Sequence, residues 1–441
     1  MAVCSLLIAL IAFALPGAAA AQEVPNAGTA AGLQSDSAAQ VEFGSEIRFR
    51  LRVQSDDPVT AVLFLYQVDD STVQNTAMPT LQPGVAAVAT YNWRVASVLV
   101  PGAEVRYQWQ VETASGRRST TAEQTVAYND TRFTWREARG EGVTVYSPTA
   151  DPQAGSALLE EARRTQARLS QTYGLTLDKP LKIYAYSRRE DYASAVYTGR
   201  PLEPALTVGT DRIFVLAPGG TSGMTTALQG LRREIATAVF LQKTKNAYAE
   251  PPLWLAQGFS FVMGGEELSA DTNRALGQIA QANKLLPLKS LSGSFPNNER
   301  DVNLAYVESA SAVKFIADSY GADKLRALLV AFKEGNTVDD ALKKGLGVTL
   351  DQFETRWKNA LKSGRTAAPS AAPREGQSVP AGDGGIVDRM AGPALRYWQG
   401  VFGPNTQAVV LGVGGFVVLG VLVLVVGSGV SVWRRSRAEE D

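Results

Sequence analysis

The sequence predicts an α+β protein in which strands come first and helices later. Residues 41–135 contain short runs that alternate between apolar and polar side chains, the two-residue period of strands with one buried face. From about residue 217 to 361 the apolar side chains recur at helical spacing instead, interrupted by a loop over 286–301. A length of 441 residues gives room for two or three domains, and 45% apolar residues suffice for their cores.

The N-terminal end predicts a secreted chain. Residues 1–21 have the pattern of a signal peptide, because the apolar run Val3–Leu15 is followed by a small-residue cleavage site at Ala18–Ala21. The only cysteine, Cys4, lies inside this peptide, so the mature protein has no disulfide. Residues 22–40 are small and polar, and we expect them to form a disordered leader.

Strict alternation identifies the strands of the first domain, 41–135. Residues 46–53 place four apolar side chains on one face and charged side chains on the other, and 89–95 and 105–111 repeat this pattern. The turn signals between the runs are Asp56-Asp57-Pro58, Pro83-Gly84 and Pro101-Gly102. Several short strands with one polar face predict an immunoglobulin-like or fibronectin-like β-sandwich, although the cysteine pair of antibody domains is absent.

The second domain, 136–362, begins as mixed α and β. We expect strands over 143–146, 181–186 and 213–216 and a helix over 154–173. Almost everything that follows is expected to be helical. Strands before helices favour an α+β arrangement for this domain as well.

The C-terminal end predicts a membrane anchor. Residues 363–406 are a Pro-, Ala- and Gly-rich tether with a juxtamembrane segment, 407–433 form a transmembrane helix, and 434–441 form a cytoplasmic tail. No charge occurs from Ala408 to Trp433, and about 20 apolar residues cross a bilayer. The positive cluster that follows consists of Arg434, Arg435 and Arg437. These signals predict a single-pass protein of the bacterial cell membrane, with its N-terminus outside and its C-terminus in the cytoplasm.

The most informative stretch lies between Leu231 and Gly258, which reads LRREIATAVF, a variable segment, and PPLWLAQG. It resembles the active-site core of the peptidase MA-like family, the gluzincins, which are similar in architecture to the thermolysin catalytic domain. In that family one helix carries His-Glu-x-x-His, and the next helix supplies a glutamate as the third zinc ligand. The resemblance extends over roughly residues 40–362, including the helices expected from Leu304 to Leu361 and the segment Tyr128–Trp135.

The resemblance assigns roles to five positions. Arg233 and Thr237 stand where the family has its two histidines, Gln257 stands where it has the glutamate ligand, and Glu234 is the one retained residue, a vestigial general base. Tyr306 is a candidate cleft residue. Other interpretations stay open: Glu234 forms an ion pair or hydrogen bond with Arg232, Arg233 or a neighbouring helix, and Tyr306 is a core aromatic.

A helix is expected from Met224 to Gln242, and helical spacing divides its side chains between two faces. The face toward the core is expected to carry Met224, Leu228, Leu231, Ile235 and Val239. Arg233 and Thr237 lie four residues apart and therefore share another face, which we expect to lie toward Gln257 on the next helix.

Donor chemistry argues against catalytic zinc. Zinc requires imidazole, thiolate or carboxylate donors, and the chain contains no histidine. Arg233 is a permanent cation, and Gln257 offers only an amide oxygen. We therefore expect no cofactor, although the resemblance implies zinc in active relatives.

Other functional classes find little support. Lys plus Arg and Asp plus Glu number 43 each, so no basic field predicts nucleic-acid binding. Without histidine there is no Ser-His-Asp or Cys-His machinery. Ser311-Ala-Val-Lys314 matches the Ser-x-x-Lys of penicillin-recognising enzymes, but the partner motif between it and Lys362-Ser363-Gly364 is missing.

Three functions remain from different classes. The first is a catalytically inactive pseudo-peptidase whose cleft binds peptides or a protein partner. The second is an active membrane-bound metallopeptidase with unusual ligands. The third is a structural module of the cell envelope. Bound zinc would separate the second function from the others, and an open polar cleft would separate the first from the third.

Overall fold

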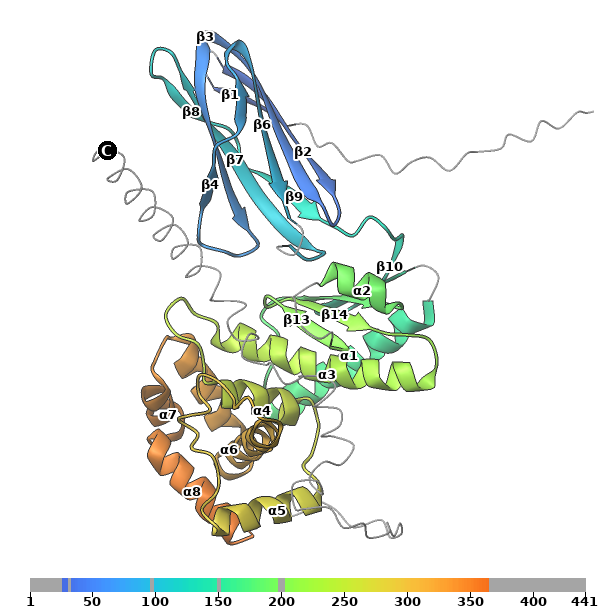
Figure 1. Ribbon diagram of the computed structural model, residues 1–441, viewed down its shortest axis with the longest axis vertical. Coiled ribbons are helices and arrows are strands. Elements are labelled where there is room, and N and C mark those ends of the chain that lie inside the picture. Colours follow the sequence, from blue (N-terminus) through green and yellow to red (C-terminus); the bar gives the residue numbers. More distant parts are fainter. Residues whose placement is uncertain (1–25, 31–32, 96–98, 149–151, 197–202, 365–441) are drawn as a thin grey trace, which may run out of the picture. The chain divides into compact units, whose positions relative to one another are not determined.

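The computed structural model describes residues 26–30, 33–95, 99–148, 152–196 and 203–364 (Figure 1). The predicted signal peptide, membrane span and tail lie outside these ranges, as does the tether beyond Gly364. Within the described residues, no helix is both long and apolar enough to span a bilayer. The chain divides into two compact units, Met1–Arg132 and Phe133–Asp441, and each is described by itself.

The first unit consists of strands that share one long member, β3. Its strands are β1 (Asn26–Ala30), β2 (Leu33–Glu42), β3 (Glu46–Val68), β4 (Asn75–Ala77), β5 (Thr80–Gln82), β6 (Gly84–Arg94), β7 (Ala103–Thr113), β8 (Arg118–Thr120) and β9 (Gln124–Tyr128). The first half of β3 pairs with β2 and β6, and its second half pairs with β4 and β7, all antiparallel. β3 therefore belongs to two layers, with a register shift between Gln54 and Val59.

Aromatic side chains from both halves of β3 fill the space between the layers. The ring of Phe49 lies 4.6 Å from that of Phe64 and 4.8 Å from that of Tyr107, measured between centroids. Trp109 closes the cluster, 4.6 Å from Phe64. The alternation predicted for 46–53 is confirmed, because its four apolar side chains are at most 2% exposed. The choice between immunoglobulin-like and fibronectin-like types stays a prediction.

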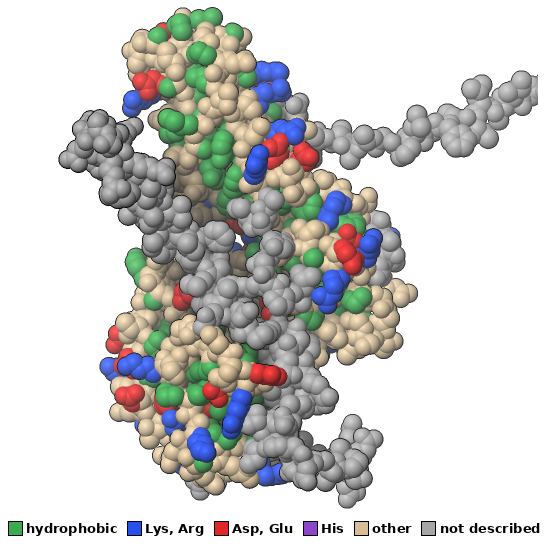
Figure 2. Space-filling model, viewed as in Figure 1, with side chains coloured by type: hydrophobic (Ala, Val, Ile, Leu, Met, Phe, Trp, Pro, Cys, Tyr) green, Lys and Arg blue, Asp and Glu red, His purple; other side chains and the backbone are tan. Residues whose placement is uncertain are grey.

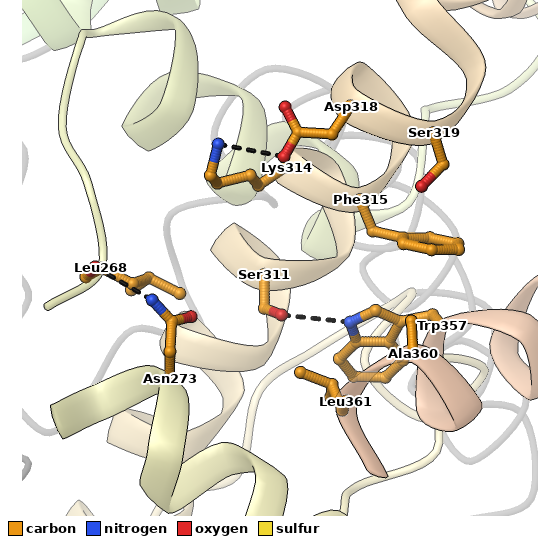
Figure 3. A pocket seen from close by; sticks show the side chains of 10 residues that line it. All are labelled: Leu268, Asn273, Ser311, Lys314, Phe315, Asp318, Ser319, Trp357, Ala360 and Leu361. Carbon is orange, nitrogen blue, oxygen red and sulfur yellow. Dashed lines mark hydrogen bonds and ion pairs between the residues drawn. The ribbon is translucent and has the colours of Figure 1, made fainter. Parts of the chain in front are cut away.

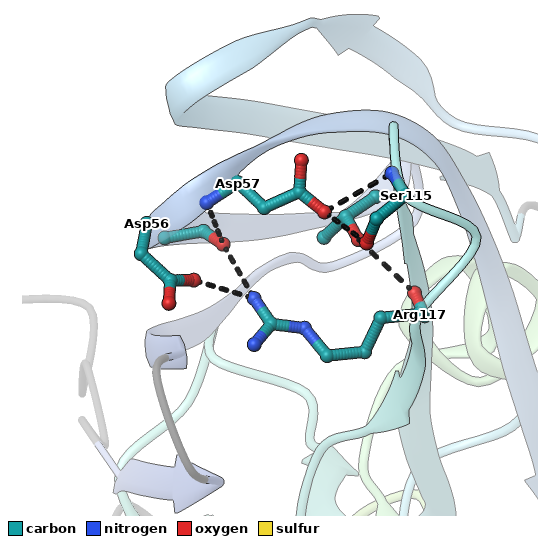
Figure 4. Close-up of polar contacts among 6 residues, drawn as sticks. Asp56, Asp57, Ser115 and Arg117 are labelled. Carbon is teal, nitrogen blue, oxygen red and sulfur yellow. Dashed lines mark hydrogen bonds and ion pairs between the residues drawn. The ribbon is translucent and has the colours of Figure 1, made fainter.

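Asp56-Asp57-Pro58 was expected to end a strand, and this expectation is wrong, because the segment is an irregularity inside β3. Figure 4 shows how the irregularity is tied to the turn after β7. Asp57 Oδ2 accepts a hydrogen bond from the Ser115 N–H at 3.1 Å, and Arg117 donates to Asp56 at 2.6 Å. Hydrogen bonds from Ser115 lower the pKa of Asp57, and the bond from Arg117 lowers the pKa of Asp56.

The disordered leader expected for 22–40 is also wrong where the structure describes it. Residues 26–30 and 33–42 form an antiparallel pair, and the second strand continues along β3. After Leu33, its buried side chains are small, including Ser37, whose Oγ accepts a hydrogen bond from the buried Trp109 Nε1 at 2.9 Å. Small polar residues such as serine usually indicate a solvent-exposed segment. Here the Ser37 hydroxyl can be buried because it has a hydrogen-bond partner.

The second unit begins with a five-stranded sheet in the order β10-β11-β12-β14-β13. These strands are β10 (Trp135–Gly140), β11 (Val143–Pro148), β12 (Leu181–Tyr186), β13 (Ala205–Val208) and β14 (Arg212–Leu216). The three central strands are parallel, and the two outer strands are antiparallel to their neighbours. Within the described residues β13 pairs only with β14, so it forms one edge of the sheet.

Helices make up the rest of the second unit (Figure 1). They are α1 (Pro152–Tyr173), α2 (Arg189–Ala195), α3 (Thr221–Thr244), α4 (Leu253–Met263), α5 (Ala270–Gln281), α6 (Glu299–Lys333), α7 (Val338–Leu346) and α8 (Leu350–Lys362). α6 is kinked at Gly321, whose φ of 81° only glycine adopts readily. The expected α+β class, with sheets first and helices later, is confirmed. The elements β10, β13 and α2 were not predicted.

α4 packs closely against α6 because Gly258 has no side chain. A Cβ atom placed on Gly258 would lie 2.1 Å from the Ser309 carbonyl oxygen and 2.7 Å from a methyl group of Val313. A backbone oxygen of another helix cannot move aside as a flexible side chain can. Gly258 therefore sets the distance between the two helices.

We predict that Gly258→Ala lowers the free energy of unfolding by about 3 kcal/mol or more, because the added methyl group forces α4 and α6 apart. Urea unfolding followed by circular dichroism at 222 nm measures the effect. Gly219→Ala is the matched control, since a Cβ there meets no atom within 4 Å. Equal unfolding midpoints for the two variants would contradict the prediction.

Candidate functional site

α3 and α4 run antiparallel, with Arg233 and Thr237 of α3 in contact with α4. Thr237 Oγ1 of α3 lies 3.1 Å from Ser260 Oγ of α4, which also donates to the Arg233 carbonyl oxygen at 3.3 Å. Four residues later on α4, a Cβ on Gly264 would lie 3.3 Å from the Cα of Arg233, which is four residues earlier than Thr237 on α3. The rings of Phe240 and Phe259 also pack together, 5.1 Å apart. Increasing numbers on α4 thus meet decreasing numbers on α3.

Arg233, at the position predicted for the first histidine, is bound by a glutamate that the sequence did not indicate. Its guanidinium donates to Glu266 through Nε and, at 2.7 Å, through Nη2. The side chains of Arg233 and Glu266 are 4% and 10% exposed. The Phe261 ring lies 5.6 Å from the guanidinium carbon, within the range of a cation–π contact.

Thr237, at the second histidine position, is engaged with its own helix and with α4. Its Oγ1 lies 3.0 Å from the Arg233 carbonyl oxygen and 3.1 Å from Ser260 Oγ. Ser260 of α4 therefore lies against α3. Gln257, at the predicted third position, is half-buried and lies one turn before Ser260 on α4, and its orientation toward α3 stays a prediction.

Glu234 is bound to the edge strand of the sheet. The Thr207 N–H of β13 donates to Glu234 Oε2 at 2.8 Å, and Thr207 Oγ1 donates to the Glu234 carbonyl oxygen at 3.0 Å. The arginines considered as partners bind elsewhere: Arg232 pairs with Glu161 and Arg233 with Glu266. Burial raises the pKa of Glu234, and the hydrogen bonds from Thr207 act in the opposite direction.

The core face predicted for α3 is present. Leu231, Ile235 and Val239 are at most 1% exposed, and Met224 and Leu228 are half-buried against the same core. Tyr306 belongs to the core of the helical part, since it is 5% exposed and its ring lies 5.0 Å from that of Phe295.

The Ser-x-x-Lys match lies at a small pocket between α5, α6 and α8, with a volume of about 90 Å³. Figure 3 shows that Lys314 extends toward Asp318, with which it pairs at 3.0 Å, and not toward Ser311. Ser311 Oγ accepts a hydrogen bond from Trp357 Nε1 at 3.1 Å. The lysine is therefore not placed to take a proton from the serine.

Residues 161–363 match the model of the Peptidase MA superfamily. This segment belongs to that superfamily. The match contains α3 and α4 with all five predicted site residues, and it ends one residue after α8. No curated protein matches the chain.

Solved structures align over different parts of the protein. Aminopeptidase A of Legionella pneumophila, in complex with aspartic acid, aligns with 71% of this chain and 47% of its own, at 12% identity and a TM-score of 0.33. The chain thus spans about half of that aminopeptidase. The Br derivative of BhCBM56 aligns with 23% of this chain and 97% of its own, at 16% identity and a TM-score of 0.18. These TM-scores are too low to carry an argument.

The residues at the predicted ligand positions do not fit zinc. A guanidinium carries no lone pair for a metal, and here it is already bound to a carboxylate. Thr237 and Gln257 supply neutral oxygens, which are poor zinc donors. Among the described residues, no cluster of three Cys, Asp or Glu side chains is placed to hold a metal.

Three residues of the site were missed by sequence reasoning: Thr207, Ser260 and Glu266. The signal that could have indicated Glu266 is the charge of Arg233, because a buried arginine requires a carboxylate nearby. Thr207 lies on a strand that was not predicted, and nothing in the sequence joins it to Glu234.

A raised pKa is not specific to Glu234. Glu308 on α6 is fully buried, and burial raises its pKa to about 8. Its Oε1 accepts a hydrogen bond from the Leu286 N–H at 3.0 Å, whereas Oε2 has no partner. The charged groups around it are Glu354, Lys358 and Asp301. Glu308 occupies none of the predicted site positions, so a buried acid in this fold does not by itself indicate catalysis.

We predict that Glu308 makes the second unit less stable as the pH rises. The folded protein retains a proton on Glu308 up to about pH 8, whereas the unfolded chain releases it near the ordinary value of 4.5. Stability should therefore fall between these values, and Glu308→Gln should remove this fall. We expect the variant to be more stable than the unaltered protein at pH 9, by a few kcal/mol, with little difference at pH 4.5.

Urea unfolding at a series of pH values measures this effect. Glu267→Gln, which removes an exposed carboxylate, is the control. If the variant and the unaltered protein keep a constant difference from pH 4.5 to pH 9, the assignment to Glu308 is wrong.

Proposed function

We propose that this protein is a catalytically inactive, membrane-anchored pseudo-peptidase whose Peptidase MA domain binds peptides or a protein partner outside the cytoplasm. The observation that carries the proposal is the buried Arg233–Glu266 ion pair. The cationic Arg233 side chain occupies the first predicted ligand position, and the Glu266 carboxylate is already paired with it. A zinc ion at this position would have to displace a guanidinium that is already desolvated and neutralised.

Without zinc, Glu234 lacks the other half of a hydrolytic mechanism. A metal lowers the pKa of its bound water so that a carboxylate can remove the proton at neutral pH. Without a metal, Glu234 would have to remove a proton from water of ordinary pKa, and one of its oxygens already accepts the Thr207 N–H. The position thus serves to hold β13 to α3.

The chemistry of the ligand follows from charge and scaffold. Acidic and basic side chains are interspersed on the face drawn in Figure 2, and the whole chain carries 43 of each. A surface without a field of one sign does not favour a polyanion such as nucleic acid. A peptide or protein segment suits the retained peptidase scaffold better.

Two segments of the sequence support the proposed location. A signal peptide over 1–21 and an uncharged segment over 407–433, followed by arginines, support a single-pass protein with both units outside the cytoplasm.

A structural envelope module is the second candidate. The engagement of Arg233, Glu234 and Thr237 with neighbouring residues of the same unit favours it, because these contacts stabilise the fold. Specific binding of peptides or of one protein would support the first candidate over this one.

We predict that the detergent-solubilised full chain contains no stoichiometric zinc and shows no chelator-sensitive peptide hydrolysis. Elemental analysis and a peptide-cleavage assay are the measurements. Tight zinc in the unaltered protein would favour an active metallopeptidase with unusual ligands. Arg233→His, Thr237→His and Gln257→Glu together should introduce zinc binding, since they restore three donors on facing helices. No zinc in this triple variant would favour the structural module.

We predict that protease added to intact cells removes both units and leaves a fragment of about the last 40 residues. The uncharged span shields this fragment, and its arginines remain in the cytoplasm. Immunoblotting against a tag placed after Asp441 detects it. Digestion of the tag in unbroken cells would contradict the proposed orientation.

A further inference from the structure

Two arginines from different helices bind the segment Met263–Glu266, where α4 ends. Arg168 of α1 donates to the Met263 carbonyl oxygen, and Arg233 of α3 donates to the Glu266 carboxylate. The first contact satisfies one of the carbonyl groups that a helix leaves free at its C-terminus, where a cation is also favoured. α1 and α3 thus meet at the end of α4.

Two glycines, Gly264 and Gly265, allow the two arginine side chains to come close to the backbone at the end of α4. A Cβ on Gly264 would lie 3.1 Å from Arg233 Cγ, and a Cβ on Gly265 would lie 3.2 Å from Arg168 Cζ. Gly265 also has a φ of 84°, in the left-handed region that side chains disfavour. The segment Met263–Glu267 therefore forms a turn that both guanidinium groups can contact.

The pair of Arg233 and Glu266 is buried and bonded through two N–H groups. Water solvates such a buried pair only weakly, so each charge depends on the other for its neutralisation. A structural metal acts in a comparable way: a buried cation holds charged or polar donors from separate elements and so fixes those elements together.

We propose that Arg233 serves as an internal substitute for a metal cation, with its guanidinium joining α3 to the end of α4 through Glu266. The cation is covalently part of the chain, so the joint needs no metal supply and resists chelators. The inference goes beyond the proposed function, because it concerns what holds the helices together whether or not the cleft binds a ligand.

A double-mutant cycle on the full-length protein tests the pairing. Arg233→Met and Glu266→Leu, each alone, leave the partner charge buried and should lower the Tm of the helical unit by roughly 10 °C. The double variant should lose clearly less than the sum of the two single losses. Circular dichroism at 222 nm reports this unit, because all the described helices lie in it.

Arg233→Lys separates the geometry of the pair from its charge. Lysine keeps the positive charge but lacks the planar fork, so we expect a Tm between those of the unaltered protein and Arg233→Met. The matched control is the exposed pair Arg274–Asp271 on α5, whose side chains are 68% and 77% exposed. Arg274→Met and Asp271→Leu should each shift the Tm by about 2 °C or less.

Additive losses in the cycle, or single losses no larger than those of the control pair, would overturn the proposal. If a single variant does not fold, the double variant decides: recovery of folded protein supports the pairing, and failure of the double variant overturns it. A chelator should leave the Tm of the unaltered protein unchanged. A fall in Tm with chelator would contradict both this inference and the proposed function, whereas an additive cycle would contradict only the inference.

Discussion

The close packing of α4 between α3 and α6 is the constraint on which the helical unit depends. On one side Gly258 lets α4 approach the backbone of α6, and on the other Ser260 hydrogen-bonds to the backbone of α3. Neither contact involves a large apolar side chain, yet together they fix how far α4 lies from each neighbour. The larger side chains around them, including Trp254 and Phe259, pack within the space that this spacing leaves.

The predicted ligand positions are occupied by internal contacts within the second unit. Arg233 binds Glu266, Glu234 binds Thr207, and Thr237 contacts Ser260. A buried polar group without a partner costs free energy, and at each of these positions a residue of the surrounding chain supplies the partner. These contacts therefore tie α3 to β13 and to α4 without a metal.

Period and spacing in the sequence predicted most of the elements but not the contacts of the site. The strand over 46–53 and the core face of α3 follow from local patterns, and both are present. The strand over 33–42 was missed because its buried side chains include serines. Ser37 is buried with a hydrogen bond from Trp109, which is distant in the sequence, so no local pattern indicates it. The partners of Arg233 and Glu234 lie 33 and 27 residues away, so no local pattern encodes them. Burial of an ionisable side chain is decided by tertiary packing, as Glu308 shows.

The shared strand β3 has a mechanical consequence for the N-terminal unit. Because its first half belongs to one layer and its second half to the other, neither layer can separate without breaking pairing in both. The ties from Asp56 and Asp57 to the turn after β7 reinforce the point where the strand passes between layers. A stretching force applied along β3 would thus act on the strand pairing of both layers at once, so we expect the two layers to unfold together rather than one after the other.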